Sequence, residues 1–63
     1  MASEVSRKDY GVSDKGPVVV IGKQELDDNG NPLPTTYEVR HGVRTVVSGV
    51  SQSKADTLAK ALV

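Results

Sequence analysis

The last third of the chain, residues 37–63, limits the possible folds more than any other stretch. Two runs rich in β-branched residues, 37–40 and 43–47, flank the pair His41 and Gly42, and such residues favour a pleated, half-buried surface. This pattern predicts a β-hairpin that turns at His41 and Gly42. The residues that follow have helical spacing, so the segment predicts two strands and then a helix.

The predicted helix begins at a sequence that resembles a capping box. The tetrapeptide 53–56, Ser-Lys-Ala-Asp, places a Ser three residues before an acidic side chain, so that each can accept a hydrogen bond from the other's backbone N–H. We expect Ser53 to cap a helix that runs from about Lys54 to the end of the chain, with Asp56 and Lys60 facing water. Its apolar residues recur at helical spacing and should face a sheet: Ala55, Leu58, Ala59 and Leu62.

A first strand is predicted where four apolar residues follow Gly16 and Pro17. Aliphatic, β-branched side chains favour a strand over a helix in such a short run. Because successive side chains of a strand point to opposite faces, a run of four requires that both faces be covered. A central strand would show this pattern, and so would a strand under a dimer contact. We interpret this run as a candidate interaction surface, covered by another protein or by a second copy of the chain. Its residues are Val18, Val19, Val20 and Ile21.

Residues 27–32, Asp-Asp-Asn-Gly-Asn-Pro, predict the turn that joins the first strand to the second in an antiparallel hairpin. Asn-Gly tolerates a positive φ, and Pro32 cannot donate a hydrogen bond into a sheet. A helix–loop–helix calcium site needs a twelve-residue ligand frame that is closed by a Glu, and this turn lacks that frame. We therefore expect a solvated turn rather than a metal site.

Together these segments predict an α+β fold, a three-stranded antiparallel sheet with one C-terminal helix packed on a face, in the order β-β-β-α. Residues 17–63 would form this single small domain. Residues 1–16 mix Ser, Lys, Asp and Gly with isolated apolar side chains, a composition that predicts a flexible N-terminal arm.

The pairing of the two strands around His41 stays open. A two-residue turn would place Val39 opposite Arg44. A three-residue turn would place Val39 opposite Thr45, and it would set Arg40 against Arg44, a like-charged pair that destabilises a sheet. The sequence does not choose between these two registers.

Composition limits how a fold of this size can be stabilised. The chain has 63 residues, no Cys, no Phe and no Trp, and its only aromatic residues are two Tyr. Disulfides and thiolate metal sites are therefore excluded. A core built mainly from Val, with Ile21 and four Leu, buries little area, so we expect self-association or a bound partner.

The formal charges cancel overall but are not evenly spread along the chain. The formal net charge is zero, with four Lys and Arg against six Asp and Glu in residues 1–32, and four against two in residues 33–63. This polarity is weaker than that of most dedicated nucleic-acid or membrane binders. The first residues lack the apolar core of a secretory signal, and the longest apolar run is too short to span a bilayer. We expect a cytoplasmic protein that does not bind membranes.

Motifs that would carry catalysis fail on spacing or on composition. Gly16 and the pair Gly22-Lys23 resemble a phosphate-binding loop, but five residues separate the glycines where four are needed, and Gln24 replaces the required Ser or Thr. One His and no Cys leave too few ligands for a closed zinc site. A nucleophile needs a base beside it, and the only His, His41, is expected at a turn tip in solvent. We expect no catalytic residue, no metal and no cofactor, so that the protein is not an enzyme.

The basic residues of the second half, with the predicted helix N-terminus, are candidate contacts for an anion or a nucleic acid: Arg40, Arg44, Ser53, Lys54 and Lys60. The stretch Ser-Gly-x-Ser-x-Ser-Lys at residues 48–54, with Ala-Leu at 61–62, resembles the last strand and final helix of double-stranded RNA-binding domains. The resemblance implies phosphate contacts from the Ser-Lys entry. The chain departs from that family because it lacks the preceding helix and the run of lysines, and because Thr57 stands where Ala is usual. Three strands and a helix also resemble the topology of arm-type DNA-binding modules of integrases.

Two interpretations follow from these observations. The first is a small non-catalytic protein-interaction or regulatory module that self-associates and binds itself or another protein. The alternative is a nucleic-acid-binding module that uses the basic second half and the helix N-terminus.

Overall fold

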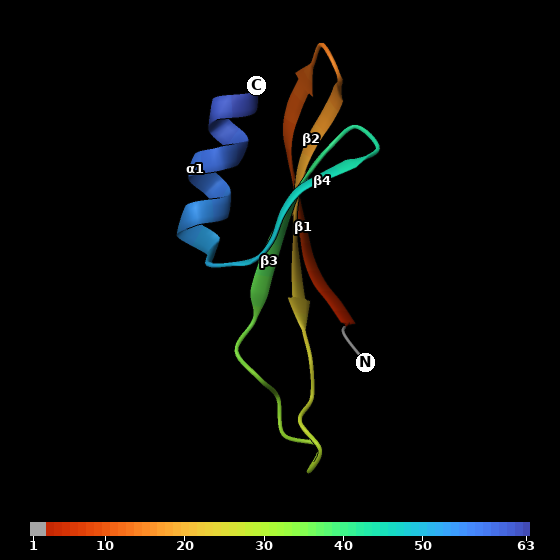
Figure 1. The fold of residues 1–63 in the computed structure, drawn as a ribbon, viewed down its shortest axis with the longest axis vertical. Helices are drawn as coiled ribbons and strands as arrows, with labels where there is room; N and C mark the ends of the chain where they lie inside the picture. Colours follow the sequence, from red (N-terminus) through yellow and green to blue (C-terminus); the bar gives the residue numbers. More distant parts are fainter. Residues whose placement is uncertain (1–2) are drawn as a thin grey trace.

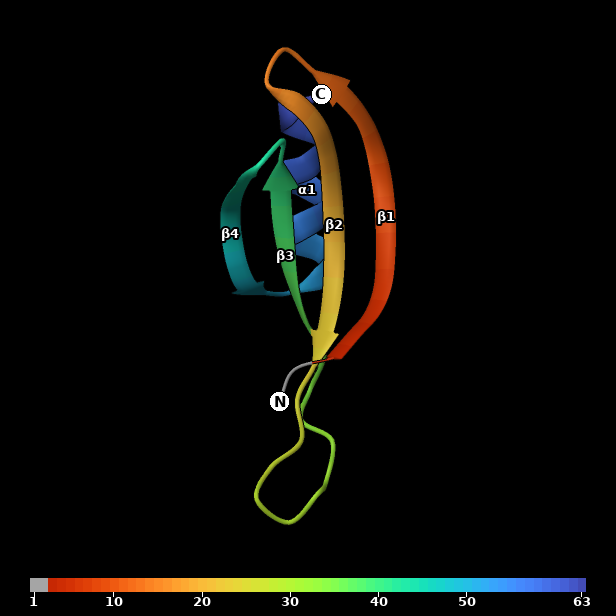
Figure 2. The ribbon, with the colours of Figure 1, turned by 90° about the vertical axis from the view of Figure 1, so that its right-hand side faces the viewer.

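The computed structural model describes residues 3–63 as a four-stranded antiparallel sheet followed by one helix (Figure 1). The elements are β1 (Ser3–Ser13), β2 (Gly16–Gln24), β3 (Thr36–His41), β4 (Arg44–Val50) and α1 (Gln52–Leu62). Strands adjacent in sequence are adjacent in the sheet, in the order β1-β2-β3-β4. The helix lies on one face, mainly over β2 and β3 (Figure 2). The predicted α+β class with a C-terminal helix is confirmed.

The prediction of three strands is wrong, because a fourth strand, β1, forms within the segment expected to be a flexible arm. β1 pairs with β2 along its whole length, from Ser3 opposite Gln24 to Ser13 opposite Gly16. It is an edge strand whose side chains are mostly exposed, so it lacks the apolar alternation that would have marked it as a strand. Its charges and two register irregularities are features that keep an edge from pairing with other chains.

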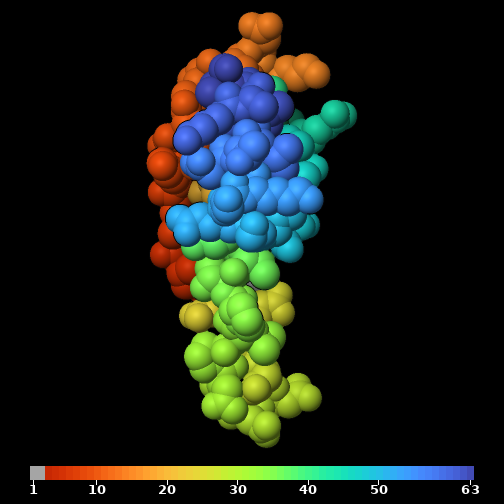
Figure 3. All heavy atoms as spheres, turned by 90° about the vertical axis from the view of Figure 1, so that its left-hand side faces the viewer, coloured from red at the N-terminus to blue at the C-terminus, as the bar shows by residue number. Residues whose placement is uncertain are grey.

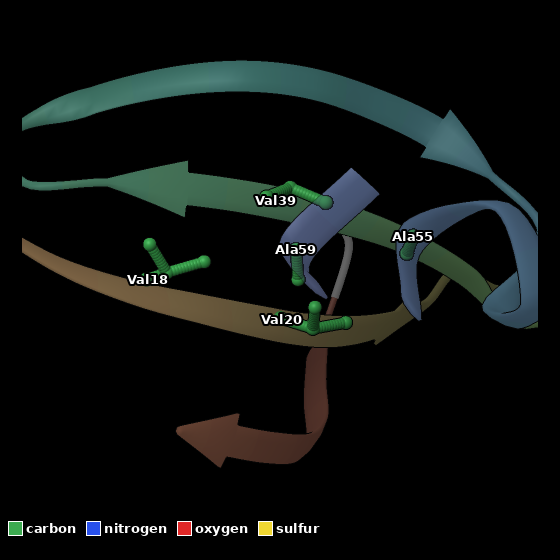
Figure 4. Close-up of a cluster of buried hydrophobic side chains, with 5 residues drawn as sticks. All are labelled: Val18, Val20, Val39, Ala55 and Ala59. Atoms are coloured by element: carbon green, nitrogen blue, oxygen red, sulfur yellow. The ribbon is translucent and has the colours of Figure 1, made fainter. Parts of the chain in front are cut away.

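The core lies between the helix and the two central strands (Figure 4). Small Ala side chains on the helix let it approach the sheet closely, and the partly buried Leu58 and Leu62 pack against the same cluster, so the predicted apolar stripe is confirmed. The five central side chains are each at most 5 % exposed: Val18, Val20, Val39, Ala55 and Ala59.

The other face of β2 is also covered within one chain. Val19 and Ile21 are 4 % and 1 % exposed. The strand register places charged residues of β1 and β3 on both sides of them, and the aliphatic parts of such side chains can cover apolar neighbours: Arg7, Asp9, Glu38 and Arg40. The residues predicted as an interaction surface, Val18 to Ile21, are therefore buried in the single chain.

The β3–β4 pairing differs from both registers that the sequence left open. His41 pairs with Arg44, so that Gly42, at φ +66°, and Val43 form the loop. Val39 pairs with Val47, because an irregularity in β4 inserts one extra residue. This insertion keeps Val47 packed against the core cluster.

The helix begins two residues earlier than predicted. Ser51, in an extended conformation, accepts a hydrogen bond from the backbone N–H of Lys54 at 3.2 Å, so Ser51 and not Ser53 is the N-cap. Ser53 lies inside the first turn, where its carbonyl accepts a hydrogen bond from the Thr57 hydroxyl. The predicted helical segment is otherwise confirmed.

Residues 25–35, here called the finger, connect β2 to β3 and extend beyond the helix at one end of the molecule (Figures 1 and 3). The molecule measures 43 × 20 × 15 Å along its principal axes. The finger contains the predicted turn, whose antiparallel connection is confirmed by the bridge between Leu26 and Pro32.

The loops between β1 and β2 and between β3 and β4 meet at the opposite end of the molecule. The backbone N–H of Gly42 donates to the Pro17 carbonyl at 2.8 Å. A Cβ at Gly42 would collide with the carbonyl oxygen of Lys15, so only glycine allows this close approach.

Candidate interaction surfaces

The finger holds its two leucines in solvent. Leu26 is 56 % exposed and Leu33 is 41 % exposed, although both flank a hydrogen-bonded turn. Leu33 also lines a shallow hollow of about 350 Å³ at the base of the finger, with Glu25, Pro34 and Thr36. The finger therefore presents apolar side chains that do not contribute to the core.

Hydrogen bonds fix the conformation of the finger. One carboxylate oxygen of Asp27 accepts from the backbone N–H groups of Asn29 and Asn31, each at 2.9 Å. The Asp27 N–H donates to the Asn31 carbonyl at 2.9 Å, and the Leu33 N–H donates to the Glu25 carbonyl at 2.8 Å. A loop with these bonds presents its side chains in a defined arrangement before any partner binds.

The finger is also acidic. Glu25, Asp27 and Asp28 lie within residues 25–35, which contain no Lys or Arg. One end of the molecule therefore combines apolar side chains with negative charge.

The opposite end of the molecule has a hollow of about 560 Å³, here called the basic hollow. It is lined by basic, polar and apolar side chains of the two loops, β3, β4 and the helix: Lys15, His41, Val43, Arg44, Thr45, Val46 and Leu62. Val43 is fully exposed and Val46 is 38 % exposed. Among residues 3–63, no Asp or Glu lines the hollow, although Asp14 neighbours Lys15 in the sequence.

His41 contacts a residue that the sequence did not indicate. Its Nε2 forms a hydrogen bond with the Ser13 hydroxyl, which links the ends of β1 and β3. Within residues 3–63, His41 has no hydrogen bond or ion pair with a carboxylate that would orient it as the base of a Ser nucleophile. The contact therefore joins two strand ends and gives no support to a catalytic role.

The structure does not bring the five predicted anion contacts together. Arg44 lines the basic hollow, and Ser53 and Lys54 lie exposed in the first turn of the helix. Lys60 Nζ is 3.0 Å from a carboxylate oxygen of Asp56. Arg40 Nε is 2.9 Å from Glu38, on the sheet face opposite the helix.

Glu38 carries a buried charge on the sheet face opposite the helix, where it is 4 % exposed. It forms ion pairs with Lys23 and, through its other oxygen, with Arg40. The hydrogen bond from Lys23 and the interactions with Arg40 hold the Glu38 pKa below its ordinary value, against the opposing effect of burial. This network neutralises Arg40 and leaves it less able to bind a phosphate.

The described part of the chain contains no helix that is both long and apolar enough to cross a bilayer. The chain matches no protein-family model, and no curated protein or solved structure is significantly similar to it.

Proposed function

We propose that the chain is a non-catalytic protein-interaction module and that the finger is its recognition element. The observation that carries this proposal is the exposure of Leu26 and Leu33 on a hydrogen-bonded loop that extends beyond the body of the domain. Exposed apolar side chains with a polar rim are typical of protein-binding surfaces. Because the loop is already ordered, a partner would bind it with little further loss of conformational entropy.

Nucleic-acid binding is the weaker proposal, since two of the five candidate residues, Arg40 and Lys60, are paired with carboxylates. The finger would also repel a phosphate backbone. A duplex would therefore have to avoid one end of the molecule.

Affinity capture from the source cell tests the finger. Tagged wild-type chain is compared with a Leu26→Ser/Leu33→Ser variant and with a control, Val5→Ser/Val12→Ser, whose valines lie on β1 and are 51 % and 78 % exposed. Neither pair belongs to the core, so both variants should fold, which circular dichroism checks. We expect proteins bound by the wild type to be retained by the control and lost by the finger variant. Identical recovery by all three baits would overturn the proposal.

A further inference from the structure

The two ends of the molecule are chemically complementary. The finger combines two exposed leucines with three carboxylates, whereas the basic hollow combines Lys15, Arg44 and His41 with the exposed side chains of Val43 and Val46. An apolar contact surrounded by opposite charges favours binding and fixes the orientation of the partners. The volume of the hollow, about 560 Å³, lies within the range of ligand pockets in proteins, roughly 300–1,000 Å³.

The finger cannot reach the hollow of its own chain, because the two lie at opposite ends of the longest axis (Figure 1). Two copies that lie side by side in opposite directions would place each finger next to the hollow of the other copy. The contact between finger and hollow then forms twice, once on each side of a two-fold axis, which closes the assembly as a dimer.

We propose that the basic hollow is the binding site for the finger of a second copy of this chain. This inference rests on the proposed function of the finger and adds the identity of its partner. Leu26 and Leu33 of one copy contact Val43 and Val46 of the other. Glu25 and Asp28 face Lys15 and Arg44.

Charge reversal at each end tests the contact by sedimentation velocity at 50 mM NaCl. The finger variant is Glu25→Lys/Asp28→Lys, which leaves Asp27 free to hold the turn. The hollow variant is Lys15→Glu/Arg44→Glu. A control, Glu4→Lys/Asp9→Lys, has the same net charge as the finger variant but carries its changes on β1.

We expect a wild-type dimer with a concentration-dependent sedimentation coefficient, and the same dimer for the control. The finger and hollow variants alone should each dimerise at least about tenfold more weakly, because like charges then meet at both contacts. Mixed in equal amounts, they should form a mixed dimer of near wild-type affinity, since the reversed finger fits the reversed hollow and the two unchanged ends fit each other. The mixture also shows that both variants are folded.

A monomeric wild type at several hundred micromolar would overturn the inference, as would variants that dimerise like the wild type or a mixture that stays monomeric. After any of these outcomes, the proposed function still stands if Leu26→Ser/Leu33→Ser abolishes capture of another protein, because the finger would then recognise that protein and not a second copy. If that variant changes neither capture nor dimerisation, the proposed function fails with the inference.

Discussion

The hydroxyl of Tyr10 donates a hydrogen bond to Asp56 Oδ1 and joins β1 to the helix across 46 positions of the sequence. Lys60 pairs with the other oxygen of the same carboxylate at 3.0 Å, and Lys8 Nζ lies 4.9 Å from the centre of the Tyr10 ring. The hydrogen bond to Asp56, followed by burial and the negative charge of Asp56, raises the pKa of Tyr10 to about 12. The strand that the sequence predicts as an arm is thus attached to the helix.

We expect the free energy of unfolding to fall between pH 10 and pH 12. The folded-state pKa of Tyr10 is raised above its ordinary 10.0, so its contribution is complete below pH 10 and is lost as the pH rises through about 12. Tyr10→Phe should cost about 1 kcal/mol at pH 7 and should flatten this decline. Tyr37→Phe is the control, because it keeps the bond to Asp56. Urea unfolding at several pH values measures both effects, and equal slopes for the two variants would contradict the prediction.

Acid should destabilise the protein through Glu38. Its folded-state pKa is lowered, first by the hydrogen bond from Lys23, so its contribution is present above the ordinary value of 4.5 and is lost as the pH falls through the lower folded value. Glu38→Gln should cost about 2 kcal/mol at pH 7, since it leaves two cations without their buried partner. The variant should then lose less stability than the wild type below pH 4.5. Glu4→Gln, at an exposed position, should behave like the wild type in the same urea titrations.

The contact between the two loops predicts that Gly42→Ala is more destabilising than Gly30→Ala. Both glycines have positive φ, +66° and +82°, so both substitutions carry the cost of a left-handed conformation, about 1–2 kcal/mol. Only at Gly42 would the new Cβ also collide with the Lys15 carbonyl, whereas Gly30 has nothing within 4 Å. The Gly42 variant should lose at least about 1 kcal/mol more in thermal or urea unfolding. Equal losses would mean that the loops separate at little cost.

The helix cap can be tested with a further pair of matched variants. Ser51→Ala should destabilise the protein by about 0.5–2 kcal/mol, because the Lys54 N–H loses its acceptor. Ser53→Ala should have a much smaller effect, since the contact that involves Ser53 uses its carbonyl and not its side chain. Urea unfolding of both variants decides between the two caps. A larger loss of stability for Ser53→Ala would show that Ser53 is the N-cap, as the capping box in the sequence predicts.

Local signals were enough to predict the helix, its apolar stripe and the turn in residues 27–32, because each depends on neighbours in sequence. β1 was missed because Val5 and Val12 are exposed and the strand forms by pairing with β2, a long-range interaction. The β3–β4 register was missed for a similar reason. Its irregularity keeps Val47 packed against the core, and nothing in the local sequence reports that requirement.

The candidate surfaces were harder to predict than the fold. The sequence showed an acidic turn but not that Leu26 and Leu33 would stay exposed on either side of it. The basic hollow combines Lys15, His41, residues 43–46 and Leu62, which are far apart in the chain and meet only when both hairpins and the helix have formed. Of the four residues that the sequence favoured as an interaction surface, Val18 and Val20 are covered by the helix. Val19 and Ile21 are buried on the opposite face, beside the side chains of β1 and β3.

Salt dependence separates protein binding from nucleic-acid binding. Each phosphate that a cation neutralises releases condensed counterions, so a nucleic-acid complex that used Arg40, Arg44, Lys54 and Lys60 would weaken steeply between 50 and 200 mM salt. Two of these cations are paired with Glu38 and Asp56, and the net charge is zero. We therefore expect labelled duplex RNA and DNA to bind weakly or not at all in fluorescence anisotropy at physiological salt. Tight, salt-sensitive binding that disappears in Arg40→Ala/Arg44→Ala, but survives in Leu26→Ser/Leu33→Ser, would favour the nucleic-acid proposal over the finger.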